Sequence, residues 1–333
     1  MYQKIQDVTL RNGEAAEMGI LLGPDTTEWG KSVRTLLGHK GEIWRWQVDE
    51  SLNKQLGCES RFYILSKACK PFANIMIVED RGIAIFGHVW TVPEERRKGA
   101  ADIIHAHLME DFKRRGGRAM YLGTGYDTHP YHLYAKHGFQ GVEPKSGYMT
   151  WFAKGQQAFE SEVFAKGAVR HEALEMKHWP TLPALAMMKH PARIRIAGMN
   201  ILNVVSTEGG ALPYLSEMSS AAAEKRKAAR RAWVAVSQSS GVPVAIAAVA
   251  PEAIFEKQGD ILDVFCAPGF EPELPKLVQK LELDPNRGVV AYADPLWPAK
   301  YEALKACGLQ QTGSIKRFLS TPDGVVDVNV FSK

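Results

Sequence analysis

Thr91-Val-Pro-Glu-Glu-Arg-Arg-Lys-Gly-Ala-Ala101 decides the fold, because this stretch lies between an apolar, strand-like run and an amphipathic helix. Residues 72–78 and 83–92 form two short apolar runs rich in β-branched side chains, and Arg81-Gly82 separates them. This pattern predicts a pair of antiparallel strands. Pro93 ends the second strand, because proline has no N–H to donate to a neighbouring strand.

A helix is expected directly after this stretch. Ile104, Leu108 and Phe112 recur at helical spacing, and Gly116-Gly117 supplies a left-handed stop, so the helix is predicted to span about 101–115. The next apolar run, 118–124, predicts a strand. Strand, loop, helix and strand together form a βαβ unit with parallel strands and a right-handed crossover.

The loop before this helix has the features of an anion site. Arg96, Arg97 and Lys98 supply positive charge, and the small residues at 99–101 allow the backbone to approach a ligand closely. The N-terminus of the helix adds free backbone N–H groups and the positive end of the helix dipole. The loop is therefore predicted to bind a pyrophosphate group.

A second motif follows the predicted strand at 118–124. Leu133-Tyr-Ala-Lys-His-Gly-Phe139 contains Tyr-x-x-x-Gly-Phe, one helix and one strand after an Arg-x-x-Gly-x-Ala loop. Over roughly residues 72–152 this order resembles the GNAT superfamily of acetyl-CoA-dependent N-acetyltransferases. The resemblance implies an α/β (α+β) fold, in which a mixed, mostly antiparallel twisted sheet contains a parallel central βαβ unit flanked by helices.

The same resemblance implies a cofactor site. In that family the backbone amides of the loop bind the coenzyme A diphosphate, and main-chain groups at the end of the preceding strand pair with the pantetheine arm and the acetyl carbonyl. The corresponding residues of this sequence are Thr91, Val92, Pro93, Arg96, Arg97, Lys98, Gly99, Ala100, Ala101 and Asp127. Two of them depart from the family pattern: Arg97 stands where a glycine is common, and Asp127 stands where an asparagine often precedes the last helix.

Direct attack of an amine on a thioester needs a proton donor for the leaving thiolate and an acceptor for the proton of the amine. Tyr134 is similar to the tyrosine that acts as proton donor in the family, and a phenol with a pKa of about 10 is protonated at neutral pH. His88, on the strand that leads into the loop, is the candidate base, since its neutral form is available near neutral pH. The alternative is an ordinary strand histidine that faces the other side of the sheet.

Other histidines are expected to have no chemical role. Asp127, His129 and His132 have a spacing that suggests a metal site, but no cysteine accompanies them and polar loops are common near an active-site mouth, so no metal is expected. His105 and His107 are two apart on the predicted helix and point in different directions, which predicts surface positions.

The segment before the strand pair predicts a first strand at 16–22, a turn at 23–25 and a helix over 27–37. Trp44 and Trp46 follow this helix. In the GNAT fold, the helices after the first strand form a wall of the acceptor pocket. The two tryptophans are therefore either substrate contacts or, as is commoner for this residue type, core residues.

The second half of the chain repeats this order of elements in a weaker form. It has strand-like runs at 170–176, 233–237, 242–249, 261–268 and 289–293, and Leu304 stands where Tyr134 stands in the first half. The residues after position 268 are Gly269-Phe-Glu-Pro-Glu-Leu-Pro275, whose glutamates repel a diphosphate and whose prolines lack N–H donors. A degenerate GNAT-like domain without coenzyme A chemistry is expected, with packing, covering of the acceptor cleft or homodimerisation as its role. An unrelated α+β domain is the alternative.

Length and composition indicate a globular chain with two domains. With 333 residues, of which 45% are hydrophobic, we expect domains at 1–154 and 169–333 joined by a linker at 155–168. Four cysteines without a close-spaced pair, no signal peptide and no long apolar run favour a cytoplasmic protein with reduced thiols and no membrane contact. The net charge of +4 is mild, and the basic run 225–231 is expected to be a solvated face rather than a nucleic-acid site.

These observations favour an acyltransferase that moves an acetyl group from acetyl-CoA to a primary amine of a small molecule or peptide. A coenzyme A-binding module or sensor without catalysis is the alternative. Other nucleotide-binding enzymes are less well supported, because the sequence lacks both Gly-x-x-x-x-Gly-Lys-Ser/Thr and Gly-x-Gly-x-x-Gly. The identity of the amine is left open by the sequence.

Overall fold

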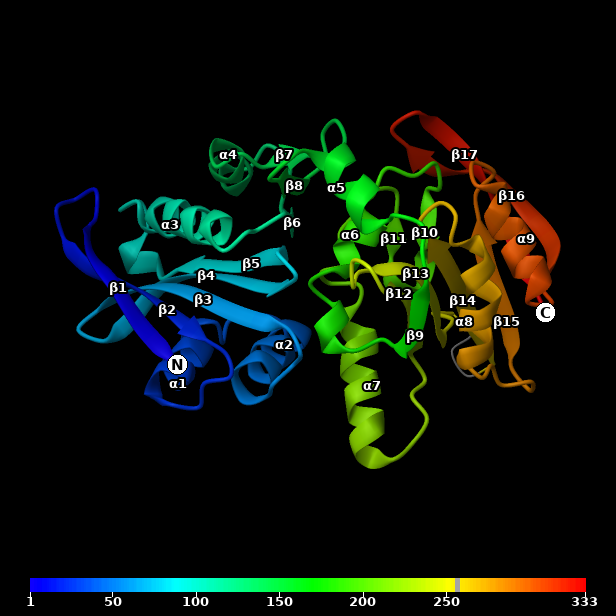
Figure 1. Cartoon of the computed structure of the whole chain (residues 1–333), viewed down its shortest axis with the longest axis horizontal. Coiled ribbons are helices and arrows are strands. Elements are labelled where there is room, and N and C mark those ends of the chain that lie inside the picture. Colours follow the sequence, from blue (N-terminus) through cyan, green and yellow to red (C-terminus); the bar gives the residue numbers. More distant parts are fainter. Residues whose placement is uncertain (255–257) are drawn as a thin grey trace. The chain divides into compact units, whose positions relative to one another are not determined.

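A computed structural model describes residues 1–254 and 258–333, and the chain divides into two units (Figure 1). The first unit comprises residues 1–141 and 145–155, and the second comprises 142–144 and 156–333. Each unit contains its own mixed β-sheet. Within the described part of the chain, no helix is long and apolar enough to cross a bilayer.

The first unit is built on an eight-stranded sheet in the order β1-β2-β3-β4-β5-β6-β8-β7. β5 and β6 are parallel, and the other neighbouring strands described in this sheet are antiparallel. The strands are β1 (Tyr2–Thr9), β2 (Ala15–Leu22), β3 (Glu59–Lys67), β4 (Lys70–Asp80), β5 (Ile83–Thr91), β6 (Ala119–Gly123), β7 (Gln140–Gly141) and β8 (Tyr148–Phe152). The helices are α1 (Glu28–Leu36), α2 (Glu42–Asn53), α3 (Ala100–Arg114) and α4 (His129–Lys136), with a 3-10 turn η1 (Pro93–Glu95).

Helices cover both faces of this sheet, with α3 on one face and α1 and α2 on the other (Figure 1). Ile104, Leu108 and Phe112 of α3 are fully buried and belong to one core cluster with Tyr63 and Ile75 of the central strands. Because both faces are covered, the central strands consist of nearly continuous apolar runs rather than alternating ones. The N-terminal half of β5, Ile83–Phe86, is therefore buried between two packed layers.

In the described part of the sheet, β5 and β6 are paired at the start of β5 and not at its C-terminal end. It pairs with β6 through Ile83–Ile85 alone among the described residues, and the two strands diverge beyond that point. On its other side, the pairing with β4 slips between Gly87 and Trp90, where β5 carries one extra residue. His88 lies in this bulge with a left-handed backbone, at φ +49°. A bulge bends a strand and re-aims its side chains, so the C-terminal half of β5 is free to line a cavity.

The second unit has a seven-stranded sheet in the order β16-β17-β15-β14-β13-β12-β9 and a separate two-stranded sheet of β10 and β11. The strands are β9 (Val169–Ala173), β10 (Ile194–Ile196), β11 (Ile201–Leu202), β12 (Arg231–Ser237), β13 (Pro243–Pro251), β14 (Gly259–Cys266), β15 (Gly288–Ala293), β16 (Gln310–Thr321) and β17 (Gly324–Ser332). The helices are α5 (Gln156–Val163), α6 (Leu182–Ala186), α7 (Leu212–Glu224), α8 (Leu274–Lys280) and α9 (Pro298–Ala306), with 3-10 turns η2 (Met176–His178), η3 (Ala197–Met199) and η4 (Glu271–Glu273).

The two large sheets share one topology. The order β9-β12-β13-β14-β15-β17-β16 matches β2-β3-β4-β5-β6-β8-β7 strand for strand. β14 and β15 are parallel, as β5 and β6 are, and the other described neighbours of the seven-stranded sheet are antiparallel. In both sheets a helix connects the two parallel strands, as such a crossover requires.

The local sequence predictions agree with these elements. The predicted strand pair corresponds to β4 and β5, and the predicted helix over about 101–115 corresponds to α3. The prediction that 16–22 is the first strand is wrong, because β1 precedes it. β1 is an edge strand with mostly exposed side chains, so it carries no apolar alternation that a sequence pattern would reveal. The segment expected as a linker, 155–168, contains α5.

Candidate functional site

A cavity of about 690 Å³ lies at the C-terminal end of β5, between the following loop, α3 and α4. Val89, Trp90 and Thr91 of β5 line it, together with the loop and the first residues of α3. The first helical hydrogen bond of α3 joins the N–H of Ile103 to the carbonyl oxygen of Gly99, at 3.1 Å. The N–H groups of residues 100–102 precede this bond, so they have no acceptor within the helix and are available to an anion.

The loop that leads into α3 has a left-handed backbone at two positions. Arg97 has φ +63° and Gly99 has φ +86°. A Cβ at Gly99 would lie 2.9 Å from the side chain of Arg11, which reaches the loop from the β1–β2 hairpin. Arg97 occupies the left-handed position despite its Cβ, at a cost of about 1–2 kcal/mol. This explains physically why a glycine would suit position 97.

The three basic residues of the loop have different surroundings. Arg96 donates from Nε to the carbonyl oxygen of Thr91 at 3.0 Å, and its guanidinium lies 4.7 Å from the ring centroid of Trp90. Arg97 lines the cavity. Lys98 instead pairs with Glu95 and Glu14, both at 3.1 Å. Arg96 and Arg97 are thus the loop cations at the cavity, while the Lys98 charge is directed to an ion-pair cluster.

Asp102, in the first turn of α3, organises the remaining charges at the cavity. Its carboxylate contacts Arg11 at 3.0 Å, Lys136 at 2.7 Å and His137 at 2.9 Å. The hydrogen bond from Lys136 is the main reason that the pKa of Asp102 is lowered to about 2. Since Arg11 and Lys136 also line the cavity, this cluster leaves the cavity edge positive despite the carboxylate. Its members are far apart in sequence, and no local motif indicates them.

Tyr134 lies on α4 and lines the cavity, with its side chain almost completely buried. Its ring packs edge-on against Phe86 and His105, at centroid distances of 5.2 and 5.7 Å. This packing fixes the ring, so the phenol has a defined position next to the end of β5. The structure thus brings Tyr134 into one cavity with Thr91, Arg96, Arg97 and residues 99–101, whereas Val92, Pro93 and Lys98 are not among the described residues that line it.

Asp127 lies just before α4, and its side chain is 70% exposed. Its backbone is left-handed, at φ +56°, and its carboxylate pairs with His132 at 2.9 Å. The side chain of Thr128 caps α4 by accepting a hydrogen bond from Tyr131 N–H. His132 lines the cavity, so Asp127 is linked to the cavity through its contact with this histidine. Among the described residues, no group of three or more possible metal ligands occurs.

The predicted surface position of His105 is wrong. His105 is fully buried, because it lies in the apolar stripe of α3 with Ile104 and Leu108. Its ring lies 4.0 Å from the ring of His137, and neither ring nitrogen has a hydrogen-bond partner among the described residues. Burial lowers the pKa of His105 to about 3, so this ring is neutral at physiological pH.

His88 points towards α2. Its Nε2 lies 2.7 Å from Oε1 of Gln47, whose Nε2 donates to Ser51 at 2.9 Å. Because the amide oxygen accepts, His88 carries its proton on Nε2 and has its lone pair on Nδ1. Burial is the main cause that lowers the pKa of His88 to about 3. Such a histidine is a weak base, and the hydrogen bond seen here is one that it donates to Gln47.

Aromatic rings surround His88 and the end of β5. Trp44 packs edge-on against His88 at 5.6 Å, and His39 stacks on Trp90 at 3.7 Å. Trp44 and Trp90 are both half-buried, so Trp44 is not a core residue of the usual fully buried kind. The long-range partners Gln47 and His39 could not be identified from sequence, since each contact depends on how α1 and α2 cover the sheet.

In the second unit, aromatic and basic side chains pack against β14, the strand that corresponds to β5 in the shared strand order. Phe265, in the C-terminal half of β14, packs against His190 and Trp297 at centroid distances of 4.9 and 5.6 Å. Arg195 is fully buried, with its guanidinium 5.4 Å from the Phe265 ring. Lys300 of α9 is also buried and donates to the carbonyl oxygen of Ile194 at 3.0 Å. The connecting helix α8 has 7 residues, whereas α3 has 15.

The basic run 225–231 of the second unit is largely occupied in contacts within the protein. Arg226 and Arg230 both pair with Glu217, at 3.3 and 3.4 Å. Arg231 donates to the carbonyl oxygen of Leu281 at 2.7 Å. Residues 225–227, 229 and 230 are nevertheless exposed, as predicted for a solvated face. All four cysteines are free thiols.

Comparison with known proteins gives similarity to solved structures alone. No family model matches the sequence, and no curated protein matches it. One similar structure is a ribosomal-protein-S5-alanine acetyltransferase from Vibrio fischeri, with 12% identity, a TM-score of 0.38, and coverage of 51% of this chain and 94% of that one. An N-acetyltransferase from Staphylococcus aureus Mu50 has 10% identity, a TM-score of 0.38 and coverages of 50% and 98%.

A third similar structure is a PaiA N-acetyltransferase from Thermoplasma acidophilum in complex with coenzyme A. Its identity to this chain is 12%, its TM-score is 0.30, and the match covers 40% of this chain and 98% of that one. These three structures are acetyltransferases. The three matches cover between 40% and 51% of this chain.

Proposed function

We propose that this protein transfers an acetyl group from acetyl-CoA to the primary amine of a small molecule or peptide. One observation carries the proposal: a left-handed loop, the N-terminus of α3 and the phenol of Tyr134 all line a single cavity at the end of an open strand. The loop suits a diphosphate, and a phenol suits the protonation of a leaving thiolate. The sequence motifs predict the same pair of functions.

The cofactor is held by residues of the first unit. The N–H groups at the start of α3 bind the diphosphate, and Arg96 and Arg97 add positive charge beside it. Asp102 supports this site by orienting Arg11 and Lys136. Val92 N–H already donates to Phe72 O at 2.9 Å, so main-chain groups of β5 that face β6 are the ones left for the pantetheine arm. Acetyl-CoA supplies the reactive thioester when it is bound.

Tyr134 and His88 have different tasks in this proposal. Tyr134 gives the proton of its hydroxyl group to the sulfur of the leaving coenzyme A, and the resulting phenolate regains a proton from the nitrogen of the new amide through solvent. His88, held by Gln47 in the tautomer with a free Nδ1 lone pair, positions the amine by accepting a hydrogen bond. A histidine with a pKa of about 3 removes a proton from an ammonium group poorly, so the amine loses its proton to solvent before or during binding.

The second unit is proposed to be a degenerate copy of the first, with domains at about 1–154 and 169–333 as predicted from composition. The shared strand order supports this proposal. The segment that leads into α8 supports the loss of coenzyme A chemistry, because Glu271 and Glu273 repel a diphosphate and Pro272 and Pro275 lack N–H donors. One active site per chain is therefore expected.

A thiol-release assay tests the proposal. The full chain is incubated with acetyl-CoA and a panel of polyamines, aminoglycosides, arylalkylamines and short peptides, and products are checked by mass spectrometry for one added acetyl group. Amine-dependent thiol release with an acetylated product is expected for at least one class. Coenzyme A binding without transfer to any amine of the panel would instead favour a coenzyme A-binding module or sensor.

A further inference from the structure

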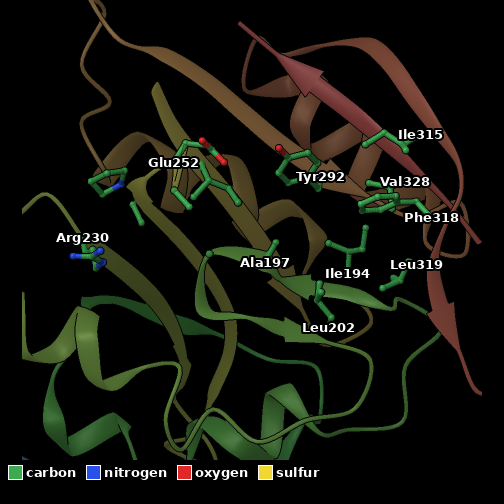
Figure 2. Close-up of a pocket in the computed structure, with 15 residues that line it drawn as sticks. Ile194, Ala197, Leu202, Arg230, Glu252, Tyr292, Ile315, Phe318, Leu319 and Val328 are labelled. Carbon is green, nitrogen blue, oxygen red and sulfur yellow. The ribbon is translucent and has the colours of Figure 1, made fainter. Parts of the chain in front are cut away.

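The second unit contains a cavity of about 660 Å³, whose described lining residues all lie in this unit. Ile194 of β10 and Ile261 of β14 form one wall, and Val328 of β17 with Ile315 and Phe318 of β16 forms another (Figure 2). Sites for small molecules typically have volumes of about 300–1,000 Å³ and a mostly apolar lining with a few polar groups. The cavity has the size and lining of such a site, and it has no part in the acetyl transfer proposed above.

The hairpin of β16 and β17 presents apolar side chains at this cavity. The strand register breaks between Ile315 and Leu319, and Arg317 in the break has φ +48°. A left-handed non-glycine residue is strained, and such strain persists only where the surrounding contacts impose it. Here the carboxylate of Asp327 accepts from the backbone N–H of Arg317 and from Lys316, both at 2.9 Å. These contacts therefore hold the bulge in place.

Two large apolar side chains at this bulge are exposed. Phe318 lies in the break of the strand register and is 66% exposed, and Ile315 at its edge is 40% exposed. Both side chains line the cavity. An apolar side chain that stays in water adds little to the stability of the fold, whereas one that a ligand covers gains the hydrophobic free energy of burial on binding. A ligand with an apolar body would thus gain affinity from both residues.

The charged groups at the cavity already have partners within the chain. Glu252 accepts a hydrogen bond from the backbone N–H of Ile254 at 2.7 Å, and Arg230 pairs with Glu217 at 3.4 Å. Behind the lining, the buried carboxylate of Asp263 accepts from the backbone N–H groups of two residues that line the cavity, at 2.8 and 2.7 Å. A ligand loses its hydration on entering a mostly apolar lining, and this loss costs far more for a charged group than for an uncharged one. The lining therefore favours an uncharged ligand.

Tyr292 of β15 supplies an uncharged hydrogen-bond donor at the cavity. No hydrogen bond joins its hydroxyl group to another described residue. Burial is the main cause that raises the pKa of Tyr292, and the carboxylates of Glu252 and Asp263 raise it further, so the hydroxyl group keeps its proton at neutral pH. Figure 2 shows Tyr292 beside Glu252, away from Phe318 and Leu319. The cavity therefore has a donor at one end and an apolar surface at the other.

We propose that this cavity binds an uncharged aliphatic molecule with a carbonyl group, whose oxygen accepts a hydrogen bond from Tyr292 and whose chain packs against Ile315 and Phe318. A carbonyl oxygen accepts hydrogen bonds without carrying a charge, so it suits a phenol donor in a mostly apolar lining. A carboxylate would also be repelled by the carboxylates of Glu252 and Asp263. The second unit is then a ligand-binding domain in its own right, whether or not the first unit acetylates amines.

Calorimetric titration of the full chain with 2-octanone tests this proposal. Sodium octanoate and n-octylamine hydrochloride, which have chains of the same length and opposite charges, are expected to bind at this cavity at least about tenfold more weakly. Phe318→Ser is expected to weaken 2-octanone binding at least about fivefold, because it removes apolar surface that the ligand covers. Tyr292→Phe is expected to weaken it about three- to tenfold, the effect of one hydrogen bond, and to leave the binding of toluene, which has no acceptor, unchanged.

Val325→Ser is the matched control, because Val325 is 42% exposed on the same hairpin and is not among the described residues that line the cavity. It is expected to leave every affinity unchanged. Binding that Phe318→Ser weakens and Val325→Ser does not is assigned to this cavity. Absence of such binding for 2-octanone, or a charged ligand bound there as tightly as 2-octanone, would overturn the proposal. An effect of Tyr292→Phe that is absent for 2-octanone, or equally large for toluene, would overturn it as well.

Discussion

Replacement of Tyr134 by phenylalanine separates the chemical role of this residue from its structural role. The ring of Tyr134 packs against Phe86 and His105 at 5.2 and 5.7 Å, and its side chain is 6% exposed. Tyr134→Phe keeps all of this ring packing and removes the hydroxyl group alone. The free energy of unfolding should therefore fall by no more than about 0.5–1.5 kcal/mol, the usual contribution of one hydrogen bond.

The effect on catalysis should be much larger. Loss of a general acid typically lowers the rate by about 10²–10⁴-fold, which corresponds to about 2.7–5.5 kcal/mol of transition-state stabilisation. Since the hydroxyl group acts on the leaving sulfur and not on the diphosphate, kcat should fall while the affinity for coenzyme A stays nearly constant. The difference between these two effects distinguishes a proton donor from a residue that merely shapes the cavity.

The assay is thiol release at saturating acetyl-CoA, with the amine that gives the highest turnover, across neutral to alkaline pH. Tyr131→Phe is the matched control, because Tyr131 lies on the same helix and packs against Tyr126 at 5.3 Å. This control should keep its kcat. A kcat of Tyr134→Phe within about threefold of the unsubstituted protein would refute the assignment of Tyr134 as the acid.

Three further predictions concern the loop, a buried histidine and the support of His88. Gly99→Ala should lower stability by about 1–2 kcal/mol, because the backbone at this position is left-handed, and it should weaken coenzyme A binding by displacing Arg11. Gly116 is also left-handed but faces open space, so Gly116→Ala should lower stability alone. Equal coenzyme A affinities of the two variants would contradict this prediction. Because burial lowers the pKa of His105 from 6.5 to about 3, the unfolded chain takes up a proton at this residue below pH 6.5 while the folded chain does not, so stability falls as pH decreases towards 3. His105→Leu should therefore make the dependence of the unfolding free energy on pH less steep between these pH values, by up to about 1.4 kcal/mol per pH unit; a slope equal to that of the unsubstituted protein would count against the buried, neutral state. Gln47→Leu should leave the His88 Nε2–H without its acceptor and lower stability by about 1–3 kcal/mol. It should also raise KM for the amine without changing the affinity for coenzyme A. An unchanged KM would show that His88 does not position the amine.

The parts of the site that could be predicted from sequence are those whose residues are neighbours in the sequence. The loop residues from Arg96 to Ala101 follow one another directly, and the helix after them shows a clear apolar stripe, so the position of this loop at the start of a helix could be predicted. The motif that indicates Tyr134 lies within one helix and the turn that follows it. Local spacing suffices in such cases, because the elements are short and adjacent in the chain.

The remaining features depend on contacts between distant segments. Gln47 meets His88 across 41 positions, and Arg11 meets Asp102 across 91. The bulge that turns His88 towards α2 arises from a slip between β4 and β5, which no pattern within β5 indicates. His105 was misplaced because its two-residue spacing from His107 shows that the rings diverge, but does not show which of them faces the core. Exposed edge strands such as β1 carry no apolar signal at all.

Calorimetric titration with coenzyme A tests the central claim most directly, by comparing the full chain with its Ala101→Glu variant. Ala101 lines the cavity in the first turn of α3. A glutamate there interacts favourably with the helix dipole, so folding is preserved, while its charge opposes a bound diphosphate. One coenzyme A per chain is expected, with binding weakened by salt and by at least about tenfold in Ala101→Glu. Absence of binding to the folded chain, or equal binding by both proteins, would contradict a diphosphate site at this loop.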